Sequence, residues 1–262
     1  KSGAAKMEKK QSRIAAEGIA RVAVNGNVAV VAEVNSETDF VAKNETFQEF
    51  VQTVADTALA SDLNGGANGE DIEALLATNG LSDLLVEKTA TIGEKLSVRR
   101  FAKVTGDAVA SYIHGGGRIG VVIAADGASD DAAKEALTNI AMQVAAMNPP
   151  YLKREDVPAA VLDEEKKIIL AQMAEDPKMA NKPEQVKEKI AAGKVGKYYG
   201  ENCLLEQAFV KENKETVQSY VDGVAKAAGT TIAITDFVRF ERGEGIEKKA
   251  DNFAEEIASM IK

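Results

Sequence analysis

The sequence contains a single cysteine, a single histidine and no tryptophan. With only Cys203 available, an internal disulfide is excluded and a metal site built from several thiolates cannot form. So little cysteine is typical of a reducing compartment, and we expect the protein in the cytoplasm. Catalysis by a nucleophile and a base usually needs a histidine, and here only His114 is available.

Long apolar runs are also missing. No run approaches the ~20 residues that a membrane-spanning helix needs, and no stretch has the pattern of a signal peptide. We therefore expect no contact with a membrane. The chain begins with lysine instead of methionine, so we expect it to be a fragment of a longer protein.

Positive charge is outnumbered in this chain. The 41 acidic and 32 basic residues give a formal net charge of −9. A surface that binds phosphates needs clustered lysines and arginines, so we expect no direct contact with nucleic acid. Basic residues do gather at the N-terminus without aromatic neighbours, which predicts a solvated arm or a first helix: Lys1, Lys6, Lys9, Lys10 and Arg13.

Motifs of catalysis and nucleotide binding are absent as well. The sequence has no nucleophile elbow, no His-Glu-x-x-His and no Walker A loop. The stretch "GGGRIG" at residues 115–120 satisfies the dinucleotide pattern G-x-G-x-x-G, but the strand-like "RIGVVIAA" follows where that pattern needs a helix. We interpret these glycines as a hairpin turn that needs positive φ. The sequence thus predicts no cofactor, no metal and no enzyme.

The 45% of residues that are hydrophobic are enough for a packed core, and their pattern occurs twice. A turn, a strand, a polar break and an amphipathic helix follow one another from Asn25 and again from Gly115. We expect the buried helix faces to contain Phe47, Phe50, Val51, Val54 and Ala58 in the first and Leu137, Ile140, Ala141 and Val144 in the second, with Asn44 and Ser129 as N-caps. This predicts an α+β fold of two related subdomains, each an antiparallel sheet covered by helices.

Two charged helical segments follow Pro158, with a break between Pro177 and Pro183. Each has a narrow stripe on one face, made of Val161, Glu165, Ile168, Ile169, Gln172 and Met173 in the first and Val186, Ile190 and Tyr198 in the second. The stripes favour an inserted antiparallel helical (coiled-coil) hairpin, although two ordinary surface helices fit the same pattern. A later strand and a C-terminal amphipathic helix complete the second subdomain. The expected boundaries are 1–107 for the first subdomain, 159–202 for the hairpin, and 108–158 and 203–262 for the two parts of the second subdomain.

The stretch "EVNSETDFVAKN", from Glu33 to Asn44, places a bulky aromatic directly after a carboxylate at a strand-to-helix turn. In one interpretation Asp39 caps the following helix and Phe40 packs beneath that helix as a hydrophobic staple. In the other, Phe40 points outward and contacts a second molecule. The residues alone leave both interpretations open.

The stretch "EVNSETDFVAK" resembles the signature of the bacterial elongation factor Ts family, the guanine-nucleotide exchange factors of elongation factor Tu. Further stretches resemble the same family in the same order: "KSGAAK", "IGEKLSVRR", "SYIHGGGRIGV", "CLLEQAFV" and "FVRFERGEGIEKK". The resemblance implies a core of two related subdomains and a coiled-coil hairpin. It also implies a preceding small ubiquitin-associated-like module that nothing in this sequence matches, and the chain has Ala208 where the family commonly has proline.

The resemblance implies that the protein binds elongation factor Tu in its GDP-bound and nucleotide-free forms and promotes release of GDP. Thr38, Asp39, Phe40 and Val41 would enter the partner near its Mg²⁺ site as a wedge. His114 would meet the partner near its phosphate loop, where a structural role is the alternative, and Ile92 would contact it or pack in the core. Pairing of two copies through the core or the hairpin stays open.

Other classes of function fit the residues without the resemblance. A small-molecule enzyme would use His114 with a nearby carboxylate and would need a closed pocket around that histidine. A passive helical scaffold would not need Phe40 at all. An exchange factor needs Phe40 and His114 exposed on one side of the fold.

Overall fold

The computed structural model describes residues 2–212 and 214–248 of the chain. These residues form an α+β fold with ten α-helices and two antiparallel sheets. Contacts divide the chain into two compact units that interleave along the sequence. The first unit comprises residues up to Lys103, Ile113–Gly120 and residues from Phe240 onward, and the second comprises Val104–Tyr112 and Val121–Arg239. The four segments expected from the sequence stay a prediction.

The sheet of the first unit is built on a β-hairpin. Strands β1 (Glu17–Asn25) and β2 (Val28–Ser36) pair in antiparallel register from Glu17↔Ser36 to Asn25↔Val28. Gly26 adopts a φ of 58° at the predicted turn, which suits a glycine. Strand β4 (Ser97–Thr105) lies next to β2, and the short β3 (Gly65–Gly66) forms the edge, giving the order β1-β2-β4-β3.

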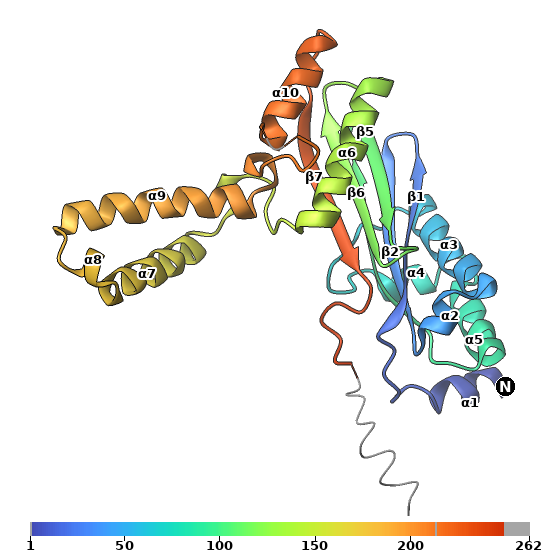
Figure 1. Cartoon of the computed structure of the whole chain (residues 1–262). Coiled ribbons are helices and arrows are strands. Elements are labelled where there is room, and N and C mark those ends of the chain that lie inside the picture. Colours follow the sequence, from blue (N-terminus) through green and yellow to red (C-terminus); the bar gives the residue numbers. More distant parts are fainter. Residues whose placement is uncertain (1, 213, 249–262) are drawn as a thin grey trace, which may run out of the picture. The chain divides into compact units, whose positions relative to one another are not determined.

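Helices of the first unit bury an apolar core against this sheet. Helix α3 (Glu45–Ala60) packs across β1 and β2, as Figure 1 shows, and all five residues predicted for its face are buried. Asn44 is its N-cap, as predicted, since its side chain accepts a hydrogen bond from the Phe47 N–H. The other helices are α1 (Ser2–Glu8), which realises the predicted first helix, α2 (Asp39–Ala42), α4 (Ile72–Leu76) and α5 (Leu81–Ile92).

The second unit repeats the pattern of a strand pair followed by a long helix. Strands β5 (Ala108–His114), β6 (Ile119–Asp126) and β7 (Ala233–Glu241) lie in the order β5-β6-β7, and α6 (Asp131–Met147) buries its predicted face. The predicted N-cap Ser129 is wrong. Asp130 caps α6 instead, because its carboxylate accepts a 2.8 Å hydrogen bond from the Ala133 N–H. Helix α10 (Val217–Ala227) was not predicted.

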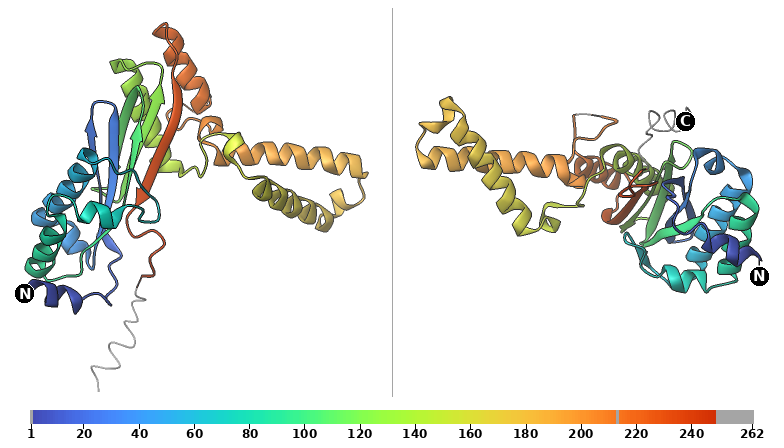
Figure 2. Two further views of the ribbon diagram at one scale, coloured as in Figure 1. Left: turned by 180° about the vertical axis from the view of Figure 1, so that it is seen from behind. Right: turned by 90° about the horizontal axis from the view of Figure 1, so that it is seen from below.

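The predicted helical hairpin is present within the second unit. Helices α7 (Ala159–Glu175) and α9 (Glu184–Asn202) pack on each other, with α8 (Pro177–Ala180) at the tip, and both figures show them side by side (Figures 1 and 2). This excludes two separate surface helices. The core of the hairpin is small: Ile169, Met173 and Ala191. The predicted stripe is partly wrong, since Ile168 and Val186 are 45% and 40% exposed.

Short 3₁₀ helices lie at the base of the hairpin, at Arg154–Asp156 and Leu204–Glu206. There Tyr151 and Cys203 form an isolated β-bridge, and Arg154 pairs with Glu206. The predicted C-terminal helix falls on residues 249–261 and lies outside the described residues. Within the described part of the chain, no helix is long and apolar enough to cross a membrane.

Candidate functional site

The loop that joins β2 to α3 presents Phe40 to solvent. Phe40 is 80% exposed and has the greatest exposure of the large hydrophobic residues that the structure leaves accessible. It belongs to α2, whose next two residues face inward: Val41 packs against the core of the first unit and Ala42 is buried. Since successive helical residues are ~100° apart, this inward face directs Phe40 outward. The staple interpretation is therefore wrong.

Thr38, and not Asp39, is the N-cap of α2. Its backbone is extended, with φ −122° and ψ 156°, and its hydroxyl accepts a hydrogen bond from the Val41 N–H at 3.3 Å. Asp39 is the first residue of the helix, where a negative charge suits the helix dipole. Its carboxylate forms an exposed ion pair with Lys43 at 3.2 Å, a kind of pair that contributes little to stability.

Two acidic side chains connect this loop with the turn after α5. The Glu94 carboxylate accepts hydrogen bonds from the N–H groups of Glu37 and Thr38, both at 3.0 Å, and from the Thr38 hydroxyl at 2.6 Å. In return, the Glu37 carboxylate accepts one from the Lys95 N–H at 2.6 Å and another from Arg13 at 3.3 Å. We call this reciprocal set, made by Glu37, Thr38, Glu94 and Lys95, the glutamate clip.

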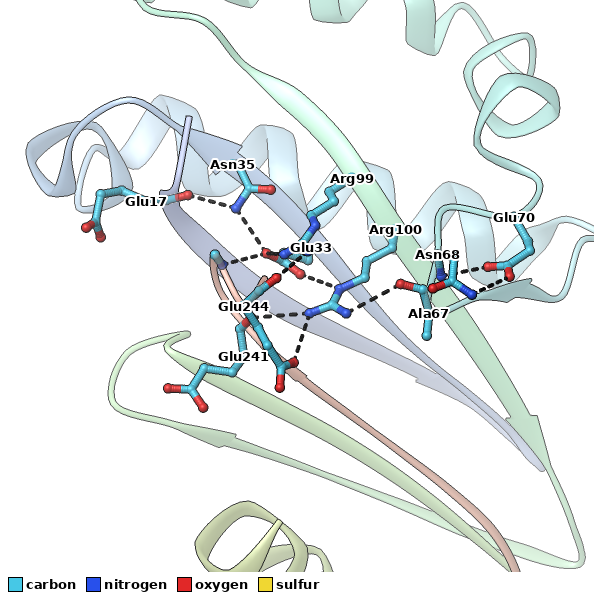
Figure 3. Close-up of polar contacts among 11 residues, drawn as sticks. Glu17, Glu33, Asn35, Ala67, Asn68, Glu70, Arg99, Arg100, Glu241 and Glu244 are labelled. Atoms are coloured by element: carbon cyan, nitrogen blue, oxygen red, sulfur yellow. Dashed lines mark hydrogen bonds and ion pairs between the residues drawn. The ribbon is translucent and has the colours of Figure 1, made fainter. Parts of the chain in front are cut away.

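The start of the same signature stretch lies in a buried ion-pair network (Figure 3). Glu33 is fully buried on β2, and its carboxylate pairs with Arg99 at 3.0 Å and with Arg100 at 2.5 Å. It also accepts a 2.8 Å hydrogen bond from the Gly243 N–H, which brings the "ERGEG" segment into the first unit. Arg100 in turn lies over the Phe240 ring. A buried carboxylate needs such partners because an unpaired charge in the interior is very costly.

His114 lies at the end of β5, directly before the glycine turn, and its side chain is exposed. The turn is a hairpin, as predicted, with φ values of 59°, 65° and 104° at Gly115, Gly116 and Gly117. The Gly117 carbonyl accepts a 2.7 Å hydrogen bond from the Ala20 N–H. A Cβ atom on Gly117 would come within 2.8 Å of the Ile19 Cβ, so this close approach to β1 requires glycine.

Comparison with known protein families shows which family this chain belongs to. A model of the family described as "Elongation factor TS" matches residues 37–244, which include the exposed loop, the glutamate clip and the glycine turn. The chain belongs to the elongation factor Ts family.

Proteins named elongation factor Ts from three bacteria resemble nearly the whole chain. The one from Trichlorobacter lovleyi is 45% identical over 275 residues, covering 99% of this chain and 85% of that protein. The one from Clostridioides difficile is 46% identical over 269 residues (99% and 86%), and the one from Syntrophotalea carbinolica is 42% identical over 272 residues (100% and 86%). This membership supports a role in translation elongation as a nucleotide exchange factor.

Within this member of the family, the predicted site residues have different environments. Phe40 and His114 are exposed and lie in the same compact unit, whereas Thr38 and Val41 are half-buried and held by the loop. Ile92 ends α5 and packs partly against the core, so its contact with a partner stays a prediction. The exposure of His114 does not match the closed pocket that the small-molecule enzyme would require.

Glu33 and Glu94 were missed by the sequence reasoning. A carboxylate inside the apolar run "VAVVAEV" was a signal that a buried cation should be sought, and Arg99 and Arg100 stand next to each other in "SVRRF". Glu94 follows shortly after Ile92 in the quoted stretch "IGEKLSVRR". A glutamate after a helix gives no indication of a distant partner. Both pairings join residues far apart in the sequence.

No part of the described chain groups three or more metal-binding side chains of histidine, cysteine, aspartate or glutamate. Cys203 is fully buried, and this burial raises the pKa of its thiol from 9.0 to about 11. Since the thiolate is the reactive form, Cys203 is poorly suited to act as a nucleophile at neutral pH.

Proposed function

We propose that this protein is the exchange factor of elongation factor Tu and that Phe40 is the residue that forces GDP release. The exposure of Phe40 on a loop held by the glutamate clip is the observation that carries the proposal. A solitary exposed phenylalanine is unfavourable in water, and burying it on a partner releases roughly 1.5–3 kcal/mol. Membership of the elongation factor Ts family supports this choice of partner and reaction.

In this mechanism Phe40 inserts between packed side chains of the GTPase domain. The insertion displaces the groups that hold Mg²⁺. Because Mg²⁺ requires nearly ideal octahedral geometry, a small displacement of its ligands weakens its coordination. In such sites Mg²⁺ is usually held by one or two carboxylates together with the phosphates of the nucleotide, so its loss would weaken the binding of GDP to the partner.

Asp39 acts beside Phe40, and its neighbours hold both in place. The exposed ion pair between Asp39 and Lys43 is weak enough for the carboxylate to exchange Lys43 for a donor on the partner. Thr38 caps α2 and Val41 anchors it to the core, so these two wedge residues set the direction of Phe40. His114 and Ile92 provide further contacts with the partner.

The energetics require no acid, base or covalent step. An exchange factor that binds the nucleotide-free GTPase more tightly than the GDP form must weaken GDP binding by the same factor. Burial of Phe40 therefore weakens GDP binding to the extent that the ring is buried in the nucleotide-free complex and not in the GDP complex.

Stopped-flow release of fluorescent GDP from elongation factor Tu tests the proposal. The wild-type chain should accelerate release. The Asp39→Ala/Phe40→Ala variant should lose most of the acceleration, by roughly tenfold or more given ~1.5–3 kcal/mol for the buried ring. The variant should stay folded, because both side chains project from the surface.

Repeating the experiment without free Mg²⁺ serves as the control for the mechanism. If the wedge acts through the metal, removing Mg²⁺ should speed release in the absence of the chain and shrink the difference between wild type and variant. An unchanged difference without Mg²⁺ would argue that the wedge acts elsewhere. No acceleration by the wild-type chain at any concentration would contradict the proposed function itself.

A further inference from the structure

We infer that Glu94 is a positioning residue for Phe40. Its carboxylate holds the loop between β2 and α3, which we call the wedge loop, in the conformation that exchange requires. The inference rests on the proposed function, since it concerns how the same loop is made ready for the partner. Glu94 does not belong to the predicted wedge, and it acts through Glu37 and Thr38.

The loop cannot hold its own shape. Between the end of β2 at Ser36 and the start of α3 at Glu45, the only buried residue is Ala42. Helix α2 spans only Asp39–Ala42, and a helix of one turn is not stable by itself because nucleation is unfavourable. The conformation that exposes Phe40 must therefore be imposed by contacts from outside the loop.

Glu94 supplies the most concentrated set of these contacts. One carboxylate accepts from two adjacent backbone N–H groups and from the hydroxyl that caps α2, so it fixes the entry of the helix in position and direction. Hydrogen bonds to a charged acceptor are stronger than those between neutral groups. The Thr38 hydroxyl donates to Glu94 and accepts from the Val41 N–H, which transmits the constraint to the residue next to Phe40.

Glu94 is itself held in a defined place. Helix α5 is fixed to the core of the first unit by buried residues such as Leu81 and Leu85, and Gly93 ends it in the left-handed conformation with φ 88°. The chain therefore leaves the helix at a sharp angle that turns Glu94 toward the loop. A Cβ atom on Gly93 would meet nothing within 4 Å, so the backbone conformation, and not crowding, calls for glycine.

Glu37 and Lys95 form the second half of the glutamate clip. Glu37 accepts from the Lys95 N–H and from Arg13, while the Lys95 ammonium donates to the carbonyls of Gln11 and Arg13 at 2.7 and 2.9 Å. The segment before β1, the wedge loop and the turn after α5 are thereby joined. Loss of Glu94 removes the hydrogen bonds at the start of α2, whereas these others and the packing of Val41 and Ala42 remain.

Rapid kinetics of GDP release with Glu94→Ala, Glu94→Gln and a control test this inference. With Glu94→Ala, contacts outside the wedge still form the complex, but Phe40 is correctly placed in a smaller fraction of complexes. The maximal release rate should therefore fall about tenfold, which corresponds to ~1.4 kcal/mol. Glu94→Gln keeps an oxygen that can accept from the backbone N–H groups, and it should recover most of that rate.

Glu87→Ala is the matched control, because Glu87 lies on α5, the helix that precedes Glu94, is exposed and pairs only with its neighbour Lys88 among the described ion pairs. It should leave the maximal rate unchanged. If Glu94 only stabilised the fold, Glu94→Ala would reduce the amount of folded chain, and a higher total concentration would be needed to reach saturation. The maximal release rate at saturation would stay at the wild-type value.

Amide hydrogen exchange on the chain alone gives a readout that needs no partner. In Glu94→Ala the N–H groups of Glu37 and Thr38 should exchange at least tenfold faster, which corresponds to ~1.4 kcal/mol of lost protection. The amides of β1 and β2 should be unchanged.

The inference is overturned if Glu94→Ala keeps the wild-type maximal rate, if Glu94→Gln recovers none of the loss, or if the two loop amides keep their protection. Failure of the proposed function has a different signature. In that case the wild-type chain does not accelerate GDP release from elongation factor Tu, or the Asp39→Ala/Phe40→Ala variant accelerates it as much as the wild type. Either result is independent of the substitution at Glu94.

Discussion

Phe40 and Glu33 belong to the same short stretch of sequence and have opposite environments. Phe40 is an apolar side chain that is 80% exposed, and Glu33 is a charged side chain that is fully buried. Each arrangement is unfavourable in isolation and is stabilised by neighbours: the glutamate clip holds the Phe40 loop, and two arginines neutralise Glu33. Departures of this kind from the ordinary rule of apolar inside and polar outside mark residues that merit mutation.

Replacing Glu33 by alanine should be strongly destabilising. The variant removes the closest carboxylate of the buried Arg100, which keeps the more distant Glu244 at 3.4 Å, and it removes the acceptor of the Gly243 N–H. Breaking a buried ion pair typically costs about 3–5 kcal/mol. Urea unfolding should show a clearly lowered midpoint. Glu87→Ala, at an exposed site, should change the free energy of unfolding by no more than ~0.5 kcal/mol. Equal midpoints for the two variants would show that the network around Glu33 contributes nothing to stability.

Individual helices and strands differ in how well the sequence predicted them. The face of α3 and its N-cap Asn44 were predicted because periodic apolar residues and a short polar side chain are local signals. The strand β3 was missed because two glycines carry no such signal. Gly65 pairs with β4 only because a glycine fits there, since a Cβ would lie 2.1 Å from the Phe101 carbonyl oxygen.

The hairpin of α7 and α9 shows how far an apolar stripe in the sequence predicts the packing of two helices. The seam between the helices is narrow and takes Ile169 and Met173, which are one helical turn apart. Ile168 is adjacent in sequence to Ile169 and so lies ~100° around the helix, outside the seam. The narrow stripes of the two charged helices therefore predicted the hairpin, whereas the exact residues of its seam depend on the partner helix.

The cap of α6 provides a test at the scale of the element. Asp130→Ala should lower the free energy of unfolding by about 1 kcal/mol, because it removes the side chain that accepts from the Ala133 N–H. Thermal or urea unfolding measures this loss. Ser129→Ala is the matched control at the neighbouring position and should have little effect. A larger loss of stability for Ser129→Ala than for Asp130→Ala would show that Ser129 is the N-cap, as the sequence predicted.

At the scale of the whole molecule, the first unit is assembled from segments far apart in the chain. The β5–β6 turn contributes Gly117, whose carbonyl meets the Ala20 N–H, and the segment after β7 contributes Gly243, whose N–H meets Glu33. The sequence predicted each of these segments separately. It could not predict their association, because no periodicity relates residues that are brought together only by the fold.

The candidate site shows the same division between local and distant information. The resemblance of the signature stretch to the elongation factor Ts family directed attention to Phe40, and the structure exposes that residue. Glu94 was not predicted because the role proposed for it depends on a contact with Thr38, which lies in a different segment. A residue proposed to contact a partner was thus easier to infer than the residue proposed to position it.

The most direct measurement of the central claim is the affinity of elongation factor Tu for GDP at increasing concentrations of this chain. With the wild type, the GDP dissociation constant should rise and reach a plateau that gives the coupling between the two ligands. With Phe40→Ala, the plateau should be lower by roughly tenfold or more, since burial of the ring is worth ~1.5–3 kcal/mol. Val24→Ala removes another apolar side chain that is 47% exposed and should keep the wild-type plateau. If Phe40→Ala reached the same plateau as the wild type, Phe40 would not be the source of the coupling, and the wedge mechanism would be wrong.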